Sequence, residues 1–369
     1  MSLSYDAFRS ERYFNRLDGV RALAVLLVVF VHARGQYAWQ WVCGWNGVTL
    51  FFVLSGFLIT TLSLREEETR GRLDRGAFFL RRVFRIIPLY AVSLGIYCGL
   101  MLVVGFEAAN RAHFVRSLPY FLSPLPEIPH FFDPHVPFEI SWSLGIEEKF
   151  YLVWPLLAFG LLWRFRASRR RLGLTIALAL LFQVPVWLTP HGMVVAPNSA
   201  ILAGCAIAFA LHDQASYKRL AVLGRTPVLA ALLVALLAVQ LASHWTSSEL
   251  YLLYPAVAAP VLAGVIVGRQ RALNVLELPV VRLVGRLSYA LYLTDQLALT
   301  AAEKVVPAGH GIVFDSGAIV LGVAGALPLA YILHKGVEQP CIRFGRRLIA
   351  SLKQPPAAEL AEEPVSLAA

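Results

Sequence analysis

Charged residues are scarce in this sequence. Asp, Glu, Lys and Arg make up 15% of its 369 residues, whereas 58% are hydrophobic and the mean hydropathy is +0.63. A soluble domain carries about 25% charged residues, because charge is needed to coat its surface. The composition therefore excludes disorder and argues against an ordinary soluble enzyme. It predicts an all-α, polytopic membrane helix bundle whose apolar residues face lipid.

Cysteine is also rare, and its four occurrences are scattered. There is no CxxC pair and no Cys/His spacing typical of a zinc site, so redox and metal chemistry are not expected. The spacing does not predict a disulfide framework either. The cysteines are Cys43, Cys98, Cys205 and Cys341.

Long apolar segments, in contrast, recur along the whole chain. A spanning helix needs roughly 20 apolar residues, with a range of about 17–25. We assign ten such segments, several of them short. They are Val20–Tyr37, Gly47–Leu64, Leu89–Phe106, Ser141–Leu162, Leu174–Leu188, Ala200–Leu211, Pro227–Leu241, Leu250–Gly268, Leu287–Val306 and Ala318–Leu333.

Basic residues test this assignment independently, because cytoplasmic loops of membrane proteins are enriched in Lys and Arg. If the N-terminus is cytoplasmic, 28 of the 33 Lys and Arg residues fall in the inner segments. A wrong number of spans would mix the two sets, so we predict about ten helices with both ends inside. Topology then accounts for the net charge of +10, and no nucleic-acid partner is expected. The exceptions are Arg34, Arg111, Arg116, Lys149 and Lys304.

The same topology divides the chain into a membrane domain, residues 1–352, and a cytoplasmic tail, residues 353–369. The tail is small and polar, which predicts disorder. The longest outer loop, Glu107–Ile140, is rich in proline and aromatic residues. We expect it to resist regular helix and to pack over the bundle as a cap.

Ionisable residues at membrane depth are costly and are functional candidates by default. His32 follows Arg21 by 11 residues on one helix, a rise of about 16 Å. Arg21 is therefore expected near the inner surface and His32 in the outer half. Histidine is the side chain best suited to act as a base near neutral pH. The alternative is a histidine that only bonds to a neighbouring helix.

Glu147 and Glu148 enter the membrane from outside and lie about 9–10 Å deep, a depth similar to that of His32. Adjacent helical residues point about 100° apart, so one carboxylate at most can orient the imidazole. The alternative is a structural ion pair. Asp18 lies about 21 Å of helix from His32, too far to serve it, and is expected to cap the helix or pair with Arg16 or Arg21.

Two further groups are candidates. Arg82 and Arg85 are three residues apart, share a helix face at the cytoplasmic start of a span and suit phosphate groups. Anchoring to anionic lipid is the alternative. Asp295 is deep in the ninth span with Tyr292 one turn away, where a function and a simple interhelical hydrogen bond are equally compatible with the sequence.

Six segments in this order resemble the acyltransferase-3 family of integral membrane acyltransferases. Each motif alone is weak, but together they cover nearly the whole chain. The matching residues are Leu17-Asp-Gly-Val-Arg-Ala-Leu-Ala with His32, Gly47-Val-Thr-Leu-Phe-Phe-Val-Leu-Ser-Gly-Phe-Leu-Ile, Arg82-Val-Phe-Arg-Ile-Ile-Pro, Ser141-Trp-Ser-Leu-Gly-Ile-Glu-Glu-Lys-Phe-Tyr, Ser288-Tyr-Ala-Leu-Tyr-Leu and Glu338-Gln-Pro-Cys-Ile-Arg343.

The resemblance implies an O-acyltransferase of the bacterial inner membrane. Members move an acyl group, usually acetyl, from cytosolic acyl-CoA to a hydroxyl of a cell-surface or lipid-linked carbohydrate, or of a small molecule such as a macrolide. The residues that look essential in the family correspond to Arg21, His32, Arg82 and Arg85. Many members have a histidine where this chain has Asp295. Some members carry a fused extracytoplasmic hydrolase-like domain, whereas this sequence ends soon after the tenth predicted span. We therefore expect it to work alone or with a separate partner.

A mechanism follows from these expectations. Arg21, Arg82 and Arg85 hold the CoA phosphates, and His32 deprotonates the acceptor hydroxyl while Glu147 or Glu148 fixes its tautomer. Trp142, Tyr292 and Asp295 are expected to contact the acceptor. Two alternatives remain: a covalent acyl relay on Ser55, and, from another class, a transporter or flippase of lipid-linked sugars.

Overall fold

The computed structural model describes residues 2–33, 37–164, 168–188, 196–245, 250–306 and 311–353. Within these ranges the protein is all-α, as predicted, and an isolated bridge between Ser2 and Gly268 is the one β-type pairing. The α-helices are α1 (Tyr5–Ser10), α2 (Asn15–His32), α3 (Asn46–Arg70), α4 (Arg75–Cys98), α5 (Arg111–Phe121), α6 (Ser141–Phe159), α7 (Ser168–Leu181), α8 (Val184–Leu188), α9 (Pro197–His212), α10 (Gln214–Leu220), α11 (Thr226–Ala242), α12 (Leu250–Val267), α13 (Pro279–Val305), α14 (Ile312–Leu333) and α15 (Gln339–Ser351).

Shorter elements of two kinds connect them. The 3-10 helices are η1 (Tyr37–Val42), η3 (Ala108–Asn110), η4 (Ile128–Phe131), η5 (Leu161–Arg164), η7 (Ala221–Gly224) and η8 (Arg271–Glu277). The π-helices are η2 (Gly99–Val104), which extends α4, and η9 (His334–Glu338), which joins α14 to α15.

Each of the ten predicted segments overlaps an α-helix. By length and composition, three stretches of the described chain are able to cross a bilayer: Trp39–Arg70, Arg75–Val104 and Ile312–Ser351. A helix pair bent by 77°, Gln214–Gly224 with Thr226–Ala242, would be a fourth. The protein is therefore a membrane protein, and the number of ten spans stays a prediction. Arg34 and the tail beyond Lys353 lie outside the described residues.

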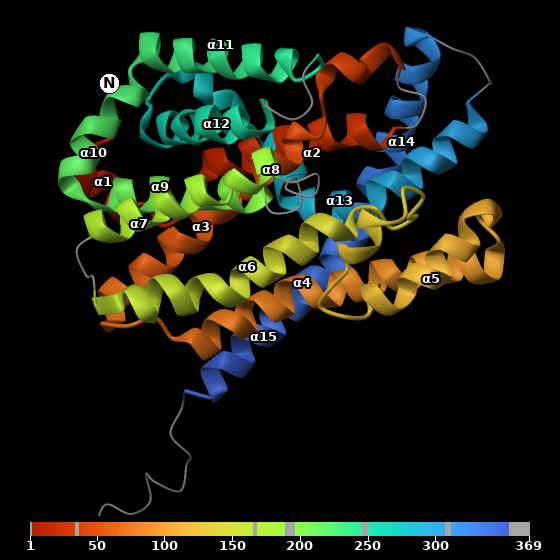
Figure 1. The fold of residues 1–369 in the computed structure, drawn as a ribbon, viewed down its shortest axis with the longest axis horizontal. Coiled ribbons are helices and arrows are strands. Elements are labelled where there is room, and N and C mark those ends of the chain that lie inside the picture. Colours follow the sequence, from red (N-terminus) through yellow and green to blue (C-terminus); the bar gives the residue numbers. More distant parts are fainter. Residues whose placement is uncertain are drawn as a thin grey trace, which may run out of the picture.

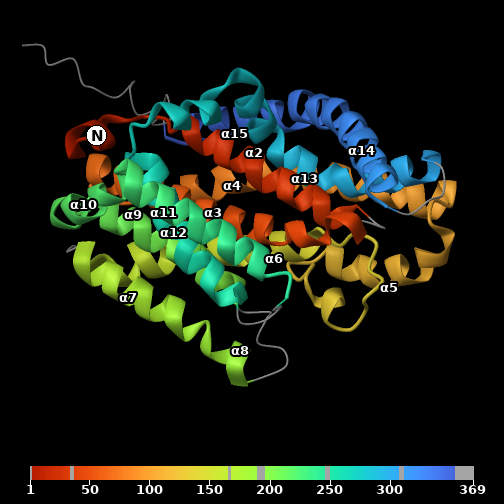
Figure 2. The ribbon, with the colours of Figure 1, turned by 90° about the horizontal axis from the view of Figure 1, so that it is seen from above.

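Helix α2 lies at the centre and packs against α13 on one side and α3 on the other, while α3 packs against α9 (Figures 1 and 2). Glycines allow the closest of these approaches. A Cβ on Gly285 of α13 would overlap the carbonyl oxygen of Asp18 in α2, and a Cβ on Gly56 of α3 would overlap that of Ile201 in α9. Small residues at helix interfaces let the backbones meet in this way.

A second group of helices closes the molecule on the other side of α13. Helix α15 runs beside α4, and α6 lies next to α4 (Figure 1). The rings of Phe84 and Phe344 are 5.4 Å apart where α4 and α15 meet, and Gly345 leaves room for Phe84.

Asp74 caps the N-terminus of helix α4, and its carboxylate accepts a hydrogen bond from the amide of Ala77 at 2.9 Å. That backbone hydrogen bond is the main cause of the lowered pKa of Asp74.

The outer loop departs from the prediction. It contains an 11-residue helix, α5, although it was expected to resist regular helix. The reason is the position of the prolines. Pro119 falls in the last turn of α5, and each of the eight helical residues before it has a backbone N–H that is able to donate a helical hydrogen bond. Beyond α5 the loop is fixed by His113, which bonds Asp133 at 2.7 Å. Burial alone would raise the pKa of Asp133, but the hydrogen bonds from His113 and from the amide of His135 lower it.

Candidate active site

His32 is the last residue of α2, and its ring nitrogen Nδ1 lies 2.9 Å from Oδ1 of Asp295 on α13. Both side chains are buried, 6% and 1% exposed respectively. A carboxylate only accepts hydrogen bonds, so Nδ1 carries a proton in this contact. Nε2 is then the ring nitrogen that could exchange a proton with a substrate, as a general base requires.

The predicted partner of His32 was wrong. We expected Glu147 or Glu148, but neither hydrogen-bonds to His32, and Asp295 takes that place. The physical reason is which helix lies next to α2: α13 packs along it, whereas α6, which carries both glutamates, contacts α3 and α4 instead. Asp18 does not reach His32, as expected, but it accepts from Tyr13 at 2.8 Å and pairs with Arg282 at 3.7 Å rather than with Arg16 or Arg21.

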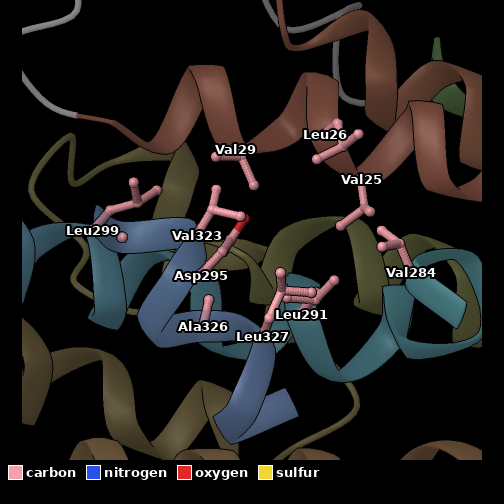
Figure 3. Close-up of a pocket in the computed structure, with 11 residues that line it drawn as sticks. Val25, Leu26, Val29, Val284, Leu291, Asp295, Leu299, Val323, Ala326 and Leu327 are labelled. Atoms are coloured by element: carbon pink, nitrogen blue, oxygen red, sulfur yellow. The ribbon is translucent and has the colours of Figure 1, made fainter. Parts of the chain in front are cut away.

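Asp295 also borders a small cavity of about 30 Å³ between α2, α13 and α14 (Figure 3). Apart from Asp295, the lining is apolar, with Val25 and Val29 from α2 and Ala326 from α14. Oδ1 of Asp295 accepts from His32 and from the amide of Gln296, whereas Oδ2 has no hydrogen-bond partner among the described residues. The volume is enough for a water molecule.

A much larger cavity, of about 540 Å³, lies between α2, α3, α4, α6, α13 and α15. This is within the usual size range of small-molecule and cofactor sites. Arginines are the commonest charged residues of its lining. They are Arg12, Arg21, Arg65, Arg81, Arg82, Arg85, Arg286 and Arg346.

The three arginines singled out by sequence, Arg21, Arg82 and Arg85, all line this cavity. None of them forms an ion pair with a carboxylate of the described residues, whereas neighbouring Arg81 pairs with Glu66 at 2.7 Å. The guanidinium of Arg82 instead lies over the ring of Tyr151, 5.2 Å from its centre. Unpaired guanidiniums in a partly buried cavity need an anion, and phosphate groups suit their geometry.

Glu147 lies in the same cavity and joins a hydrogen-bonded group with Ser55 and Tyr151. Ser55 Oγ donates to Glu147 Oε1 at 2.6 Å, and the Tyr151 hydroxyl lies 3.2 Å from Glu147 Oε2 and 3.1 Å from Ser55 Oγ. Glu148 is not among the residues that line this cavity. Lys149 pairs with Glu127 of the outer loop at 2.6 Å.

Tyr292 lies next to His32. Its hydroxyl is 2.6 Å from Ser143 Oγ, and its ring centre is 6.1 Å from that of His32 and 6.4 Å from that of Phe51. Tyr292 and Ser143 line the large cavity, and His32 does not. Trp142 is not among the lining residues either: its ring packs against Phe52 at 6.1 Å.

Sequence reasoning missed His334 and Glu338, which also line the cavity. They belong to the π-helix η9, are buried, and bond each other at 2.8 Å. Their signal was available, because two ionisable residues four apart at the end of an apolar run are rarely left there without a function. In the described residues, no group of three or more His, Cys, Asp or Glu is arranged to hold a metal ion.

Comparisons with known proteins point to O-acetyltransferases. The chain is 27% identical over 369 residues to "Peptidoglycan O-acetyltransferase OatA" of Listeria monocytogenes and 28% identical over 375 residues to "Putative peptidoglycan O-acetyltransferase YrhL" of Bacillus subtilis. These alignments cover 91% and 93% of this chain but 57% of each relative, so the chain spans little more than half their length. A putative O-acetyltransferase of Staphylococcus aureus is 31% identical over 164 residues, 43% of this chain and 27% of that protein.

No solved structure matches the chain significantly. The model of the acyltransferase-3 family, described as an acyltransferase domain, matches residues 14–335. This stretch extends from the residue before α2 into η9 and so includes Arg21, His32, Arg82, Arg85 and Asp295. Because the match covers most of the sequence, the chain belongs to the acyltransferase-3 family of membrane acyltransferases.

Proposed function

We propose that the protein is an O-acyltransferase that moves an acyl group, most simply acetyl, from cytosolic acyl-CoA to a hydroxyl of a cell-surface or lipid-linked carbohydrate. One observation carries the proposal. Tyr292 lines a cavity that also contains three arginines without a carboxylate partner, and its ring lies 6.1 Å from that of His32, which is paired with Asp295. This arrangement supports a site in which anion binding and general-base chemistry lie within one helix length of each other.

The arginine end of the cavity fits the donor. Arg21, Arg82 and Arg85 would hold the phosphates of CoA, whose negative charges satisfy guanidiniums that lack carboxylate partners. Arg21 and His32 are 11 residues apart on α2, about 16 Å. An extended pantetheine arm covers such a distance, so the thioester would lie deep in the cavity while the nucleotide stays at the cytosolic end.

His32 is placed to act on the acceptor. Its Nε2 would take the proton of the acceptor hydroxyl, whose oxygen then attacks the acyl carbonyl, while Asp295 holds the ring and stabilises the imidazolium. Tyr292 lies beside the imidazole and would contact the acceptor. Glu147 belongs to the donor end rather than to His32. We assign no step to Glu148 or to Trp142.

The names of the relatives support a carbohydrate acceptor, since two of them are called peptidoglycan O-acetyltransferases. Peptidoglycan is assembled outside the cytoplasmic membrane from lipid-linked units, so a chain of this type is expected there as a multi-pass protein in contact with the bilayer. We propose the topology with both ends inside, ten spans, and residues 1–352 as the membrane domain. The split of 28 to five basic residues supports it.

Acetyl-CoA consumption by the purified protein tests the function. Protein in lipid nanodiscs is incubated with radiolabelled acetyl-CoA and lipid-linked disaccharide-pentapeptide or muropeptides, and CoA release and label on the glycan are followed. We expect release that depends on the glycan. Glycan crossing a proteoliposome membrane without CoA release would instead identify a flippase. Transfer to a macrolide but not to any glycan would identify a small-molecule acyltransferase.

A further inference from the structure

We propose that Ser55 takes the acyl group from the donor and holds it as an ester before the acceptor receives it. The inference deepens the proposed function and rests on it. It assigns a chemical role to the hydrogen-bonded group of Ser55, Glu147 and Tyr151, which the general base His32 does not need.

The hydrogen bonds of Ser55 are those of an activated nucleophile. Its hydroxyl donates to Glu147 Oε1 at 2.6 Å, and the Tyr151 hydroxyl holds the other carboxylate oxygen at 3.2 Å. A nucleophile within hydrogen-bond reach of a base, with a third group orienting that base, is the arrangement common to enzymes that form covalent intermediates. Arg21 and Arg82 line the same cavity as Glu147, so two guanidiniums share the surroundings of this carboxyl group.

Position favours the same role. Ser55, Glu147 and Tyr151 line the cavity that holds the arginines without carboxylate partners, whereas His32 does not line it and lies next to Tyr292. Ser55 is therefore in the cavity that the acyl donor would occupy. Phe51 lies one turn before Ser55 on α3 and contacts Tyr292. An acyl group on Ser55 is therefore one helical turn from the residue that contacts Tyr292.

Helix packing does not explain Ser55. A Ser-Gly pair in a membrane helix often serves close packing, and here Gly56 does so against Ile201 of α9. Neighbouring residues of a helix point about 100° apart, which turns Ser55 towards α6 and the cavity. The two residues thus have separate tasks.

The first step forms one bond and breaks one. Ser55 Oγ gives its proton to Glu147 and attacks the thioester carbonyl, an ester bond to Oγ forms, and the carbon–sulfur bond breaks. The departing thiolate takes the proton from Glu147, so CoA leaves as the thiol and Glu147 is again a carboxylate.

The second step reverses this chemistry on the acceptor. The hydrogen bond between Tyr292 and Ser143 breaks, and the acceptor hydroxyl gives its proton to His32. The oxygen of the acceptor then attacks the ester carbonyl. The bond to Ser55 Oγ breaks, and Tyr151, which already lies 3.1 Å from that oxygen, protonates it. The proton on His32 passes through water in the cavity to Tyr151, so no proton is left over.

Trapping the ester tests the proposal. His32→Ala blocks the second step only, so this variant, given radiolabelled acetyl-CoA without acceptor, should retain close to one acetyl group per chain after denaturation, on the peptide that contains Ser55. Ser55→Ala in the same background should retain none. Ser93→Ala is the matched control, since Ser93 is a buried serine of α4 that donates to a backbone carbonyl at 3.1 Å and has no carboxylate partner. It should retain the label.

Ser55→Cys protects the test against misfolding of the alanine variant. A thiol at this position should form a thioester that neutral hydroxylamine releases, whereas the ester on Ser55 resists it. Label on another residue, or transfer by Ser55→Ala within tenfold of the unmodified protein, would overturn the relay and leave the O-acyltransferase standing. Absence of acceptor-dependent CoA release from the unmodified protein would instead refute the proposed function itself.

Discussion

Asp295 determines what His32 is able to do. Its carboxylate fixes the proton on Nδ1, and the resulting free Nε2 is the condition for base catalysis.

We therefore expect His32→Ala to lower acyl transfer by about 10²–10⁴-fold, since that is the usual contribution of a general base. Acetyl-CoA binding, measured by calorimetry, should stay within about twofold. Asp295→Asn should lower the rate as well, because an amide is also able to donate to Nδ1 and stabilise the wrong tautomer. His135→Ala, in the exposed outer loop, is the control. If His32→Ala keeps more than a tenth of the activity, His32 is a packing residue.

The arginines make a different prediction. Arg82→Ala or Arg85→Ala should weaken acetyl-CoA binding by roughly 10–100-fold, because hydrogen bonds to charged groups contribute about 1.5–3 kcal/mol. Lysine should restore little, since it lacks the planar fork of donors. Arg347→Ala tests for a general effect of charge, as this exposed arginine of α15 is not part of the cavity lining. Unchanged affinity in the double variant would leave lipid anchoring as their role.

The sequence singled out three arginines that the structure brings to one cavity, Arg21, Arg82 and Arg85, but it did not predict the partner of His32. Depth along a helix follows from residue spacing, which is why Arg21 and His32 were expected at opposite ends of one site. Direction around the helix axis and the identity of the neighbouring helix do not follow from spacing. Glu147 was therefore assigned to His32 from depth alone, although α13, not α6, packs against α2.

Among the elements, α3 shows how close packing positions chemistry. Its contact with α9 passes through Gly56 and Gly204, each of which faces a backbone carbonyl of the other helix. That close approach fixes the rotation of α3 and hence the direction of Ser55. Helical segments themselves were readily predicted from apolar runs, whereas α5 was missed because its proline content concealed eight residues able to form a helix.

Replacing Gly56 with Ala should consequently destabilise the protein, by roughly 1–3 kcal/mol, as is typical of overpacking. Gly95→Ala on α4 should act in the opposite direction, because open space surrounds Gly95 and alanine is favoured by about 0.5–1 kcal/mol in a helix. Thermal unfolding in detergent, followed by tryptophan fluorescence, measures both. Equal effects of the two substitutions would show that the contact between α3 and α9 contributes nothing.

For the molecule as a whole, the three helical stretches that are able to cross a bilayer by length and composition are longer than one crossing requires. They run over 32, 30 and 40 residues, against roughly 20 for one crossing. The parts of α3, α4 and α15 that exceed the length of one crossing carry Arg65, Arg81 and Arg346, respectively, and these arginines line the cavity. The donor site is therefore expected to extend below the membrane surface into the cytosol.

Cysteine accessibility tests this orientation. In a background without the four native cysteines, Ala109→Cys of the outer loop should react with an impermeant maleimide in intact cells, and Arg72→Cys, between α3 and α4, only after lysis. Both positions are exposed, so access depends on the side of the membrane alone. The reverse pattern would invert the topology and place the arginines outside.

The π-helix η9 has a consequence for how α15 reaches the cavity. Each residue of an α-helix turns the following chain by about 100°, and a π-bulge is in effect one inserted residue. The inserted residue rotates α15 about the helix axis relative to α14. The basic residues of α15 therefore face a direction that an uninterrupted helix would not give them. Deleting Gly336 should restore an ordinary helix, leave Ile312–Leu333 intact and swing Arg346 out of the cavity, weakening acetyl-CoA binding. One residue of η9 thus determines whether Arg346 of α15 faces the cavity.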